Sequence, residues 1–292
     1  MNRKYLQNNV LLLVLLLAFT AMKGDKPAYR LFKASGKETS YKDLLKQSLE
    51  ADVVFFGEQH HNPICHWLQL ELAGDLHKEK GSAFLFGAEM FESDNQLLLN
   101  EYISNTIKTR NFEDEAKLWP NYATDYKPLV EFARKNNIPF VATNIPRRYA
   151  ALVNKGGFEA LDSLDSAAKT LFPPLPLAFD PELKGYKELM SMDMGGTHVS
   201  ANFPKAQAVK DATMAWFINK NLGLGSIMLH LNGSYHSENY VGIIWYLKKL
   251  NPSLKILSIA TVEQENAGEL DSANTGLADY ILCVPANMTR TK

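Results

Sequence analysis

The hydrophobic positions of this chain gather into six short runs in which few polar residues alternate. Such runs are typical of strands that are buried on both faces of a parallel sheet. They are mostly rich in β-branched or aromatic residues and cover residues 53–56, 83–89, 138–143, 226–231, 255–260 and 280–284. The pattern therefore predicts six buried strands.

Helical patterns separate several of these runs. They cover residues 63–77, 127–136, 203–220 and 239–250, and the last has Val241, Ile244 and Leu247 on one side. Residues 29–39 have the pattern of a short hairpin, ahead of a helix over residues 41–49. The alternation predicts an α/β fold with a mainly parallel sheet and helices on both of its faces.

Residues 147–203 break this alternation, since they contain no convincing strand pattern. They hold a proline-rich segment at 172–176 and short helical pieces. A loop of that length without its own structure is unusual in a compact domain. We therefore expect a smaller, mostly helical insertion at about 147–203 within one α/β domain that covers residues 25–292.

The first residues predict export. Asn2-Arg3-Lys4 gives a basic start, and residues 10–21 form an apolar stretch that is too short to span a membrane but suits a signal peptide. We expect residues 1–24 to be a signal peptide and the protein to be periplasmic or in the cell envelope. The alternative is an uncleaved membrane anchor. Because no cysteine lies near the end of the apolar stretch, a lipoprotein is not expected.

Charge and cysteine content narrow the class of function. The chain has 31 basic and 32 acidic residues, and its formal net charge of −1 gives no electrostatic case for binding nucleic acid. The two cysteines, Cys65 and Cys283, are too few for a disulfide framework, and the sequence does not decide whether they form a single bridge. No Cys-x-x-Cys-His motif is present, so haem is not attached covalently in the c-type manner.

Polar residues lie at the end of each of the first four runs. The carboxyl ends of parallel strands lie on one edge of a sheet, where open α/β sheets bind ligands. We therefore expect the four groups to line one cleft suited to metal binding, general acid–base catalysis or axial ligation of haem. The groups are Gly57-Glu58-Gln59-His60-His61-Asn62, Glu89, Asn144-Ile145-Pro146-Arg147-Arg148-Tyr149 and Asn232-Gly233-Ser234-Tyr235-His236.

Structural roles compete with functional ones for the charged residues. Glu58 would also serve as a cap of the helix that follows it. Glu89 ends an apolar strand and would also serve in a structural salt bridge. Arg147 and Arg148 are either solvated or hold a carboxylate such as a haem propionate. Asp211 falls on an apolar helix stripe, where it needs a partner such as a functional arginine or histidine.

The histidines are not equivalent. His60 and His61 face opposite ways on an extended backbone, so we expect only one of them to be functional. His236 is predicted to lie in the first turn of a helix, where anions are favoured. The remaining histidines are expected near the cleft (His66), in a glycine-rich flap (His198), at the surface (His77) and hydrogen-bonded in the core (His230).

Six blocks of sequence together resemble the ChaN family of bacterial iron-regulated, haem-binding proteins, which is grouped with Tiki-like and erythromycin-esterase-like proteins. The blocks are GEQHHNPICHWLQ, the acid in FGAEMFE, NYATDYKPLVEFA, NIPRRYA, AQAVKDATMAWFI and HLNGSYHSENYVGI. The resemblance implies a parallel-sheet α/β domain and an envelope protein of iron or haem uptake. It also implies haem ligated by Tyr or His side chains and held across a homodimer. Many members have a lipoprotein cysteine after the signal, which this chain lacks.

The first hypothesis is therefore an exported, non-covalent haem-binding protein that works with the iron or haem uptake machinery of the cell envelope. Tyr149 is the leading axial ligand and Tyr235 the runner-up, because a phenolate stabilises ferric iron. The candidates for a second ligand are His60, His198 and His236. Arg147 or Arg148 would pair with a propionate.

The second hypothesis is a hydrolase. In the esterase-like relatives, the residues that match Glu58, His60, Glu89 and His236 form the active centre. His60 or His236 would act as a general base on water, or bind a divalent metal. Glu58 and Glu89 would orient the imidazoles or help to hold that metal. A third hypothesis is a scaffold in which the polar cluster is only a structural network.

Overall fold

The structure, a computed structural model, describes residues 26–191 and 200–291 of the 292-residue chain. The predicted signal peptide and His198 lie outside these residues. Within the described part of the chain, no helix has the length and apolar character needed to cross a membrane.

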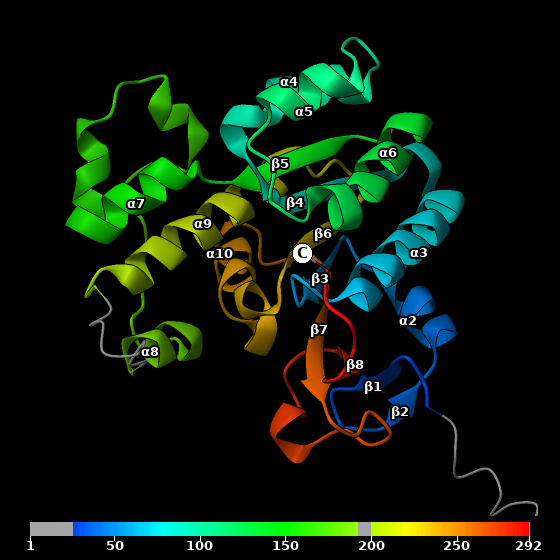
Figure 1. Ribbon diagram of the computed structural model, residues 1–292. Coiled ribbons are helices and arrows are strands. Elements are labelled where there is room, and N and C mark those ends of the chain that lie inside the picture. Colours follow the sequence, from blue (N-terminus) through cyan, green and yellow to red (C-terminus); the bar gives the residue numbers. More distant parts are fainter. Residues whose placement is uncertain (1–25, 192–199, 292) are drawn as a thin grey trace, which may run out of the picture.

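In the described part of the chain, eight strands form one sheet (Figure 1), in the order β2-β1-β8-β7-β3-β6-β4-β5. Neighbours from β8 to β5 pair in parallel, whereas β1 pairs antiparallel with both β2 and β8. The strands are β1 (Arg30–Lys33), β2 (Glu38–Thr39), β3 (Val53–Glu58), β4 (Phe84–Glu92), β5 (Phe140–Asn144), β6 (Ile227–Gly233), β7 (Ile256–Gln264) and β8 (Tyr280–Pro285).

Helices cover both faces of this sheet, which confirms the predicted α/β fold. On one face α3 and α6 pack on Val54 and Phe56, and on the other α9 and α10 pack on Val53 and Phe55 (Figure 1). Both alternating sides of β3 are therefore buried, as its unbroken apolar run predicts. The helices are α2 (Tyr41–Ser48), α3 (Pro63–Lys80), α4 (Gln96–Ile103), α5 (Thr109–Glu115), α6 (Lys127–Asn136), α7 (Arg147–Gly156), α8 (Lys184–Ser191), α9 (Phe203–Asn221) and α10 (Ile243–Leu250).

The segment between β5 and α9 contains α7, α8 and two 3₁₀ turns, and no strand among its described residues. Tyr149 and Val153 of α7 pack with Phe172 and with Val209 of α9 in a small apolar cluster of their own. The segment thus lies beside the sheet and is joined to it through α9, at the left of Figure 1.

The predicted helix over residues 239–250 begins later than expected. Its first residues form a separate 3₁₀ turn, Glu238–Tyr240, and α10 starts only at Ile243. Asn239 and Tyr240 both have positive φ angles, of 56° and 58°, which an α-helix does not accommodate. His236 therefore lies in a short 3₁₀ turn directly after β6, and its expected place in the first turn of a longer helix is wrong.

Gly57 of β3 lies where the strand passes close to two neighbours. A Cβ atom on Gly57 would lie 2.7 Å from the Ile259 carbonyl oxygen and 2.9 Å from Cα of Ser234. Because these contacts are backbone atoms that cannot rotate away, Gly57→Ala is expected to lower the free energy of unfolding by about 1–3 kcal/mol. Urea denaturation measures this change.

The matched control is the same substitution at Gly74 in α3, where a Cβ would meet no atom within 4 Å. Gly74→Ala is expected to stabilise the protein by about 0.5–1 kcal/mol, since alanine favours the helix. Equal effects of the two substitutions would contradict the close approach at β3.

Candidate functional site

The ends of β3, β4 and β6 bring together the four side chains predicted as an active centre. Glu58 is paired in register with Gly233 across β3 and β6. The carboxylate of Glu89, from β4, accepts the N–H of Gly233 at 2.8 Å, and a Cβ on Gly233 would lie 2.9 Å from the His60 ring. Parallel register thus gathers groups that are far apart in the sequence at one sheet edge.

His236 lies between two carboxylates. Its Nδ1 donates to Oδ1 of Asp211 at 2.6 Å, and its Nε2 lies 3.3 Å from Oε1 of Glu89. All three side chains are buried. Asp211, which the sequence places on an apolar helix stripe in need of a partner, therefore finds one in His236. Its other oxygen accepts a hydrogen bond from the Tyr186 hydroxyl of α8 at 2.6 Å.

This geometry holds His236 as an imidazolium. Burial opposes its charge, but Glu89 and Asp211 outweigh burial and raise the pKa of His236 to about 10. Burial likewise opposes the charge of Glu89, yet the pKa of Glu89 is lowered because His236, His60 and the Gly233 N–H favour the carboxylate. Burial raises the pKa of Asp211. Neither ring nitrogen of His236 is free to act as a base at neutral pH.

Glu58 has a different set of neighbours, all of which donate to it. One oxygen accepts from Nδ1 of His60 at 2.9 Å and from the Tyr126 hydroxyl at 2.6 Å, and the other from Nε2 of Gln69 at 2.6 Å. Glu58 does not cap the following helix, as one alternative expected, because Asn62 caps α3 by accepting from the Ile64 N–H. The carboxylate instead fixes His60.

His60 is the more accessible imidazole of the site. About 35% of its side chain is exposed, and no hydrogen bond to its Nε2 is found among the described residues. Burial lowers its pKa, but the hydrogen bond to Glu58 and the charges of Glu58 and Glu89 together outweigh burial, so the pKa is raised. Trp119 packs edge-on against the ring, with 4.9 Å between centroids. His61 is exposed.

The other histidines mostly support the structure. His66 is buried and contacts the His60 carbonyl oxygen through Nε2 at 3.1 Å. His230 is a core residue, as predicted: it contacts Thr143 and Asn232, and burial lowers its pKa to about 4. The expected surface position of His77 is wrong, because its half-buried ring packs against two phenylalanines, Phe84 and Phe132.

Tyr149, the leading predicted haem ligand, lies in the first turn of α7, directly after Arg147 and Arg148. The Arg148 guanidinium lies over its ring at 4.4 Å and donates to its hydroxyl at 3.3 Å. Neither arginine is merely solvated: Arg147 pairs with Glu92 and Arg148 with Asp94. The phenol oxygen of Tyr149 is therefore held beside a permanent cation.

Tyr235, the alternative ligand, lies in a closed environment. Its hydroxyl is buried and has no hydrogen-bond partner in the described structure. It lies against Gly185 of α8, and the space there admits no water-sized group. A haem group would have to displace α8 to reach this oxygen.

The structure gives no support to a divalent metal or a disulfide. Within residues 26–191 and 200–291, no group of three His, Cys, Asp or Glu side chains is arranged to hold a metal ion. The Nδ1 atoms of His60 and His236, the predicted metal ligands, face Glu58 and Asp211. Cys65 and Cys283 are both free and buried, so the bridge that the sequence leaves open is not formed.

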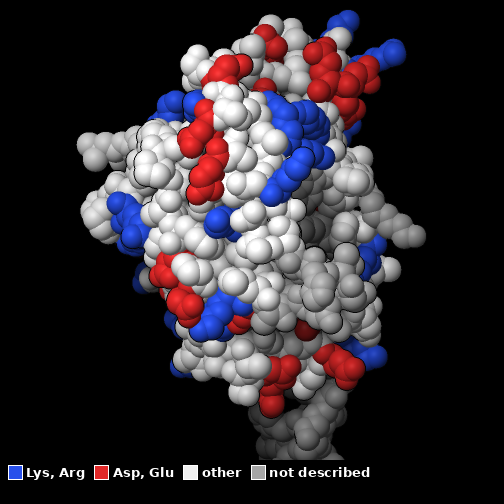
Figure 2. Space-filling model, turned by 90° about the vertical axis from the view of Figure 1, so that its left-hand side faces the viewer, with Lys and Arg blue, Asp and Glu red and all other residues white. Residues whose placement is uncertain are grey.

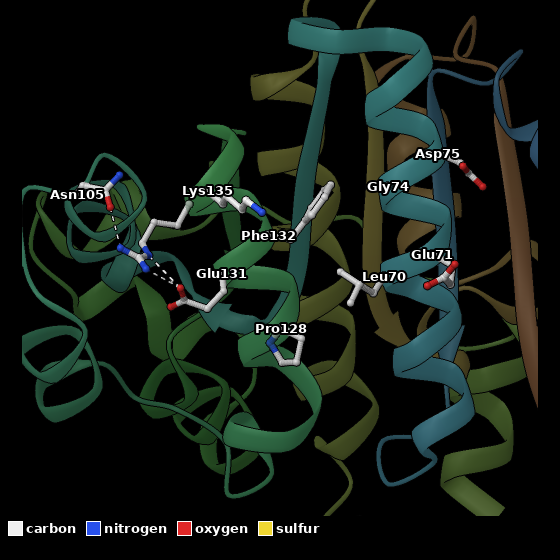
Figure 3. Close-up of a pocket in the computed structure, with 10 residues that line it drawn as sticks. Leu70, Glu71, Gly74, Asp75, Asn105, Pro128, Glu131, Phe132 and Lys135 are labelled. Carbon is white, nitrogen blue, oxygen red and sulfur yellow. Dashed lines mark hydrogen bonds and ion pairs between the residues drawn. The ribbon is translucent and has the colours of Figure 1, made fainter.

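A hollow of about 770 Å³ lies between α3 and α6 (Figure 3), but none of the predicted site residues lines it. In this view Leu70 and Phe132 face the hollow, and Glu131 hydrogen-bonds with the arginine of α6. On the face shown in Figure 2, basic and acidic side chains of the described residues form separate small groups, and neither sign covers the surface.

Trp119 and Gln69 were not predicted as residues of the site, whereas Tyr126 lies in the family-like block NYATDYKPLVEFA. Trp119 comes from the segment before α6. Gln69 lies one turn beyond His66 on the same side of α3, and that i, i+3 spacing was a usable signal for it. Lys117 was not predicted either. It pairs with Glu92 at the end of β4 and with Asp94 just after that strand.

Comparisons with known proteins agree with this fold. The family model described as "Haem-binding uptake, Tiki superfamily, ChaN" matches residues 44–247. ChaN of Campylobacter jejuni, a structure described for its cofacial haem binding, has a TM-score of 0.65 at 20% identity and covers 87% of this chain and 96% of its own. A mutant of the erythromycin esterase EreC in its open conformation has a TM-score of 0.51 at 13% identity, and the match covers 89% of this chain and 98% of that protein.

Among curated proteins, the chain is 24% identical over 224 residues to RETICULATA-RELATED 5, chloroplastic, of Arabidopsis thaliana. The match covers 70% of this chain and 30% of that protein, so the chain spans less than a third of the length of this relative. The family match confirms the resemblance seen in the sequence, and the two structural matches, at their low identity, show the fold alone.

Proposed function

Because the chain belongs to the family of haem-binding uptake proteins of the Tiki superfamily, ChaN, we propose that it is an exported protein that binds haem non-covalently in iron or haem acquisition. Tyr149 is the axial ligand in this proposal. The observation that carries it is the contact between the Arg148 guanidinium and the Tyr149 hydroxyl. The contact fixes the phenol oxygen beside the two arginines, and a tyrosine oxygen ligand favours ferric iron.

The residues around Tyr149 fit haem in their chemistry. Bound haem would supply a ferric iron that accepts the phenolate oxygen as a ligand. Arg147 and Arg148 would pair with propionates, in competition with their present partners Glu92 and Asp94. His60 is the better candidate for a second ligand than His236, because its Nε2 has no described partner whereas both nitrogens of His236 face carboxylates. His198 stays a prediction.

The test is a titration of purified, haem-free protein with hemin, read by absorbance. A saturable shift of the Soret band at micromolar hemin is expected. No shift would overturn the proposal. The molar mass of the complex in solution tests the homodimer, and fractionation of cells that express the full chain tests export to the periplasm or envelope.

A hydrolase is the second candidate function, and the Glu58–His60 pair favours it. A carboxylate that holds Nδ1 leaves Nε2 of a partly exposed imidazole available to take a proton from water. If the chain is a hydrolase, Glu58→Gln and His60→Gln are each expected to lower the rate by about 10²–10⁴-fold on any ester or amide that the wild type cleaves. Activity that is indifferent to both substitutions would exclude this site as its source.

A further inference from the structure

The residues after β8 run back across the sheet edge to the loop that follows β3. In the sheet β8 is separated from β3 by β7. The N–H of Ala286 donates to the Gln264 carbonyl oxygen at the end of β7 at 2.8 Å, and the N–H of Thr291 donates to the His61 carbonyl oxygen at 3.0 Å. In Figure 1 the red end of the chain passes from β8 to the end of β3. Residues 286–291, the strap, therefore cross β7 and reach this loop.

Thr291 joins this loop to a second segment that acts on His60. The Thr291 hydroxyl donates to Oδ2 of Asp125 at 2.6 Å. Asp125 is buried and directly precedes Tyr126, whose hydroxyl donates to Glu58 at 2.6 Å. Glu58 in turn holds Nδ1 of His60 at 2.9 Å. One strap residue thus links the loop that carries His60 with the segment that fixes its ring.

The Asp125 carboxylate is the point where the strap meets the hydrogen bonds around the His60 backbone. The same Oδ2 accepts from Nδ2 of Asn121 at 2.6 Å, and that amide also donates to the His60 carbonyl oxygen at 2.8 Å. The carbonyl group of His60 is therefore held through Asn121. The next carbonyl group, that of His61, is held through Thr291, and both holding residues rest on one buried acid.

The strap has a second attachment to the same loop. Nη2 of Arg290 donates to Oε2 of Glu263 at 2.7 Å, and Oε1 of Glu263 accepts from Nδ2 of Asn62 at 3.1 Å. Because the Arg290 side chain is 62% exposed, this ion pair contributes little to overall stability. It does limit where Asn62 can lie. Two consecutive loop residues, His61 and Asn62, are thus fixed by two consecutive strap residues.

The strap acts on the backbone beside His60 and leaves the ring to other partners. In the described part of the chain, no strap residue forms a hydrogen bond with the ring, which is held by Glu58 and packed by Trp119. The ring also lies close to Gly233 of β6, where an added Cβ would lie 2.9 Å from Nε2. A shift of the loop therefore changes where Nε2 lies without deleting any partner of the ring.

We propose that Thr291 is a positioning residue for His60: the strap fixes the loop after β3 and thereby holds Nε2 against the end of β6, where it serves as the second ligand of bound haem iron. For the role of His60 this inference rests on the proposed haem binding. It adds the part of the chain that sets the place of the imidazole. A strap with a purely structural role would alter stability and leave the position of the ring unchanged.

The first test uses the full protein without ligand, at one pH. Thr291→Val removes the hydroxyl and keeps the size of the side chain. The Asn62 N–H, which donates to the Gln59 carbonyl oxygen within the loop, is expected to exchange about tenfold faster. The Cε1–H NMR signal of His60, assigned through His60→Gln, is expected to move because its shift depends on the edge-on Trp119 ring. Thr291→Ser, which keeps the hydroxyl, is expected to restore both.

Thr275→Val is the matched control, since the Thr275 hydroxyl donates to the Ser272 carbonyl oxygen at 2.7 Å within the connection between β7 and β8. It is expected to leave the His60 signal in place. An unmoved His60 signal in Thr291→Val, or an equal movement in Thr275→Val, overturns the positioning role.

The second test adds hemin and reads the ligands of the iron by electron paramagnetic resonance. Thr291→Val is expected to lose part of the histidine-ligated signal that His60→Gln loses entirely. A full histidine-ligated signal in Thr291→Val, beside its loss in His60→Gln, overturns the positioning of a ligand. Wild-type protein that does not bind hemin overturns the proposed function, and the signal of His60 in the ligand-free protein then decides the role of the strap by itself.

Discussion

Tyr149→Phe is expected to lower the affinity for ferric hemin at least about tenfold, which corresponds to ~1.4 kcal/mol, and to remove the spectral signature of an iron–phenolate bond. The substitution deletes one oxygen and keeps the ring that packs against Phe172 at 6.0 Å. It also leaves Arg148 free to lie over the ring. Loss of hemin affinity without loss of stability is therefore the expected result, measured by absorbance titration and thermal unfolding.

Two further phenylalanine variants complete this experiment. Tyr280→Phe removes a hydroxyl that donates to Asp43 at 2.7 Å, remote from the site, and serves as the control for the loss of one phenol oxygen. Tyr235→Phe tests the alternative ligand, whose oxygen is enclosed under α8. If Tyr235→Phe loses the phenolate signature and Tyr149→Phe retains it, the assignment of the ligand is wrong.

His236→Ala is expected to lower the free energy of unfolding by about 3–5 kcal/mol near pH 6.5, because it leaves Glu89 and Asp211 buried without a counter-charge. The effect depends on pH. The pKa of His236 is about 10 in the folded protein and 6.5 as the ordinary value, so its stabilisation is complete below pH 6.5 and is lost as the pH rises toward 10. Urea denaturation at several pH values measures this dependence.

The contribution of Glu89 to stability changes with pH in the opposite direction. Its folded pKa is lower than the ordinary value of 4.5, so its stabilisation is present above that pH and is lost as the pH falls.

The matched control for His236→Ala is His230→Ala, which removes a buried histidine that is neutral above its pKa of about 4. The cost of His230→Ala should not change between pH 6.5 and 10. If the cost of His236→Ala is equally constant, the imidazolium between two carboxylates is not present.

The sheet could be predicted from the sequence because its strands are buried on both faces. Val53 to Phe56 is apolar at every position, and β3 packs helices against both sides. The strand ends could not be predicted in the same way. β3 continues to Glu58 and β4 to Glu92, since backbone pairing with the neighbouring strands does not stop where the side chains become polar.

The candidate site was predictable in part for the same reason. Groups at or just past the carboxyl ends of the strands, such as Glu58 in β3, Glu89 in β4 and His60 after β3, are brought to one sheet edge by parallel register. The partners that decide their charge come from elsewhere: Tyr126 reaches Glu58 from 68 residues away, and Lys117 reaches Glu92 from a loop. No local pattern signals such contacts, because packing of separate helices and loops creates them.

For Asp211 the sequence predicted the need for a partner but not the identity of that partner. An acid on an apolar stripe of α9 signals that a partner exists, because an unpaired buried carboxylate is costly. The stripe does not say which partner, and only the fold brings His236 to within 2.6 Å of it. Buried polar residues that break an apolar pattern are therefore useful predictors of a site, although not of its geometry.

Haem binding through the Tyr149 phenolate is tested most directly by the absorbance and resonance Raman spectrum of the wild-type protein titrated with ferric hemin. A saturable Soret shift together with vibrations of an iron-bound tyrosinate is the expected result. A spectrum that stays that of free hemin, or a bound haem without tyrosinate vibrations, would contradict it.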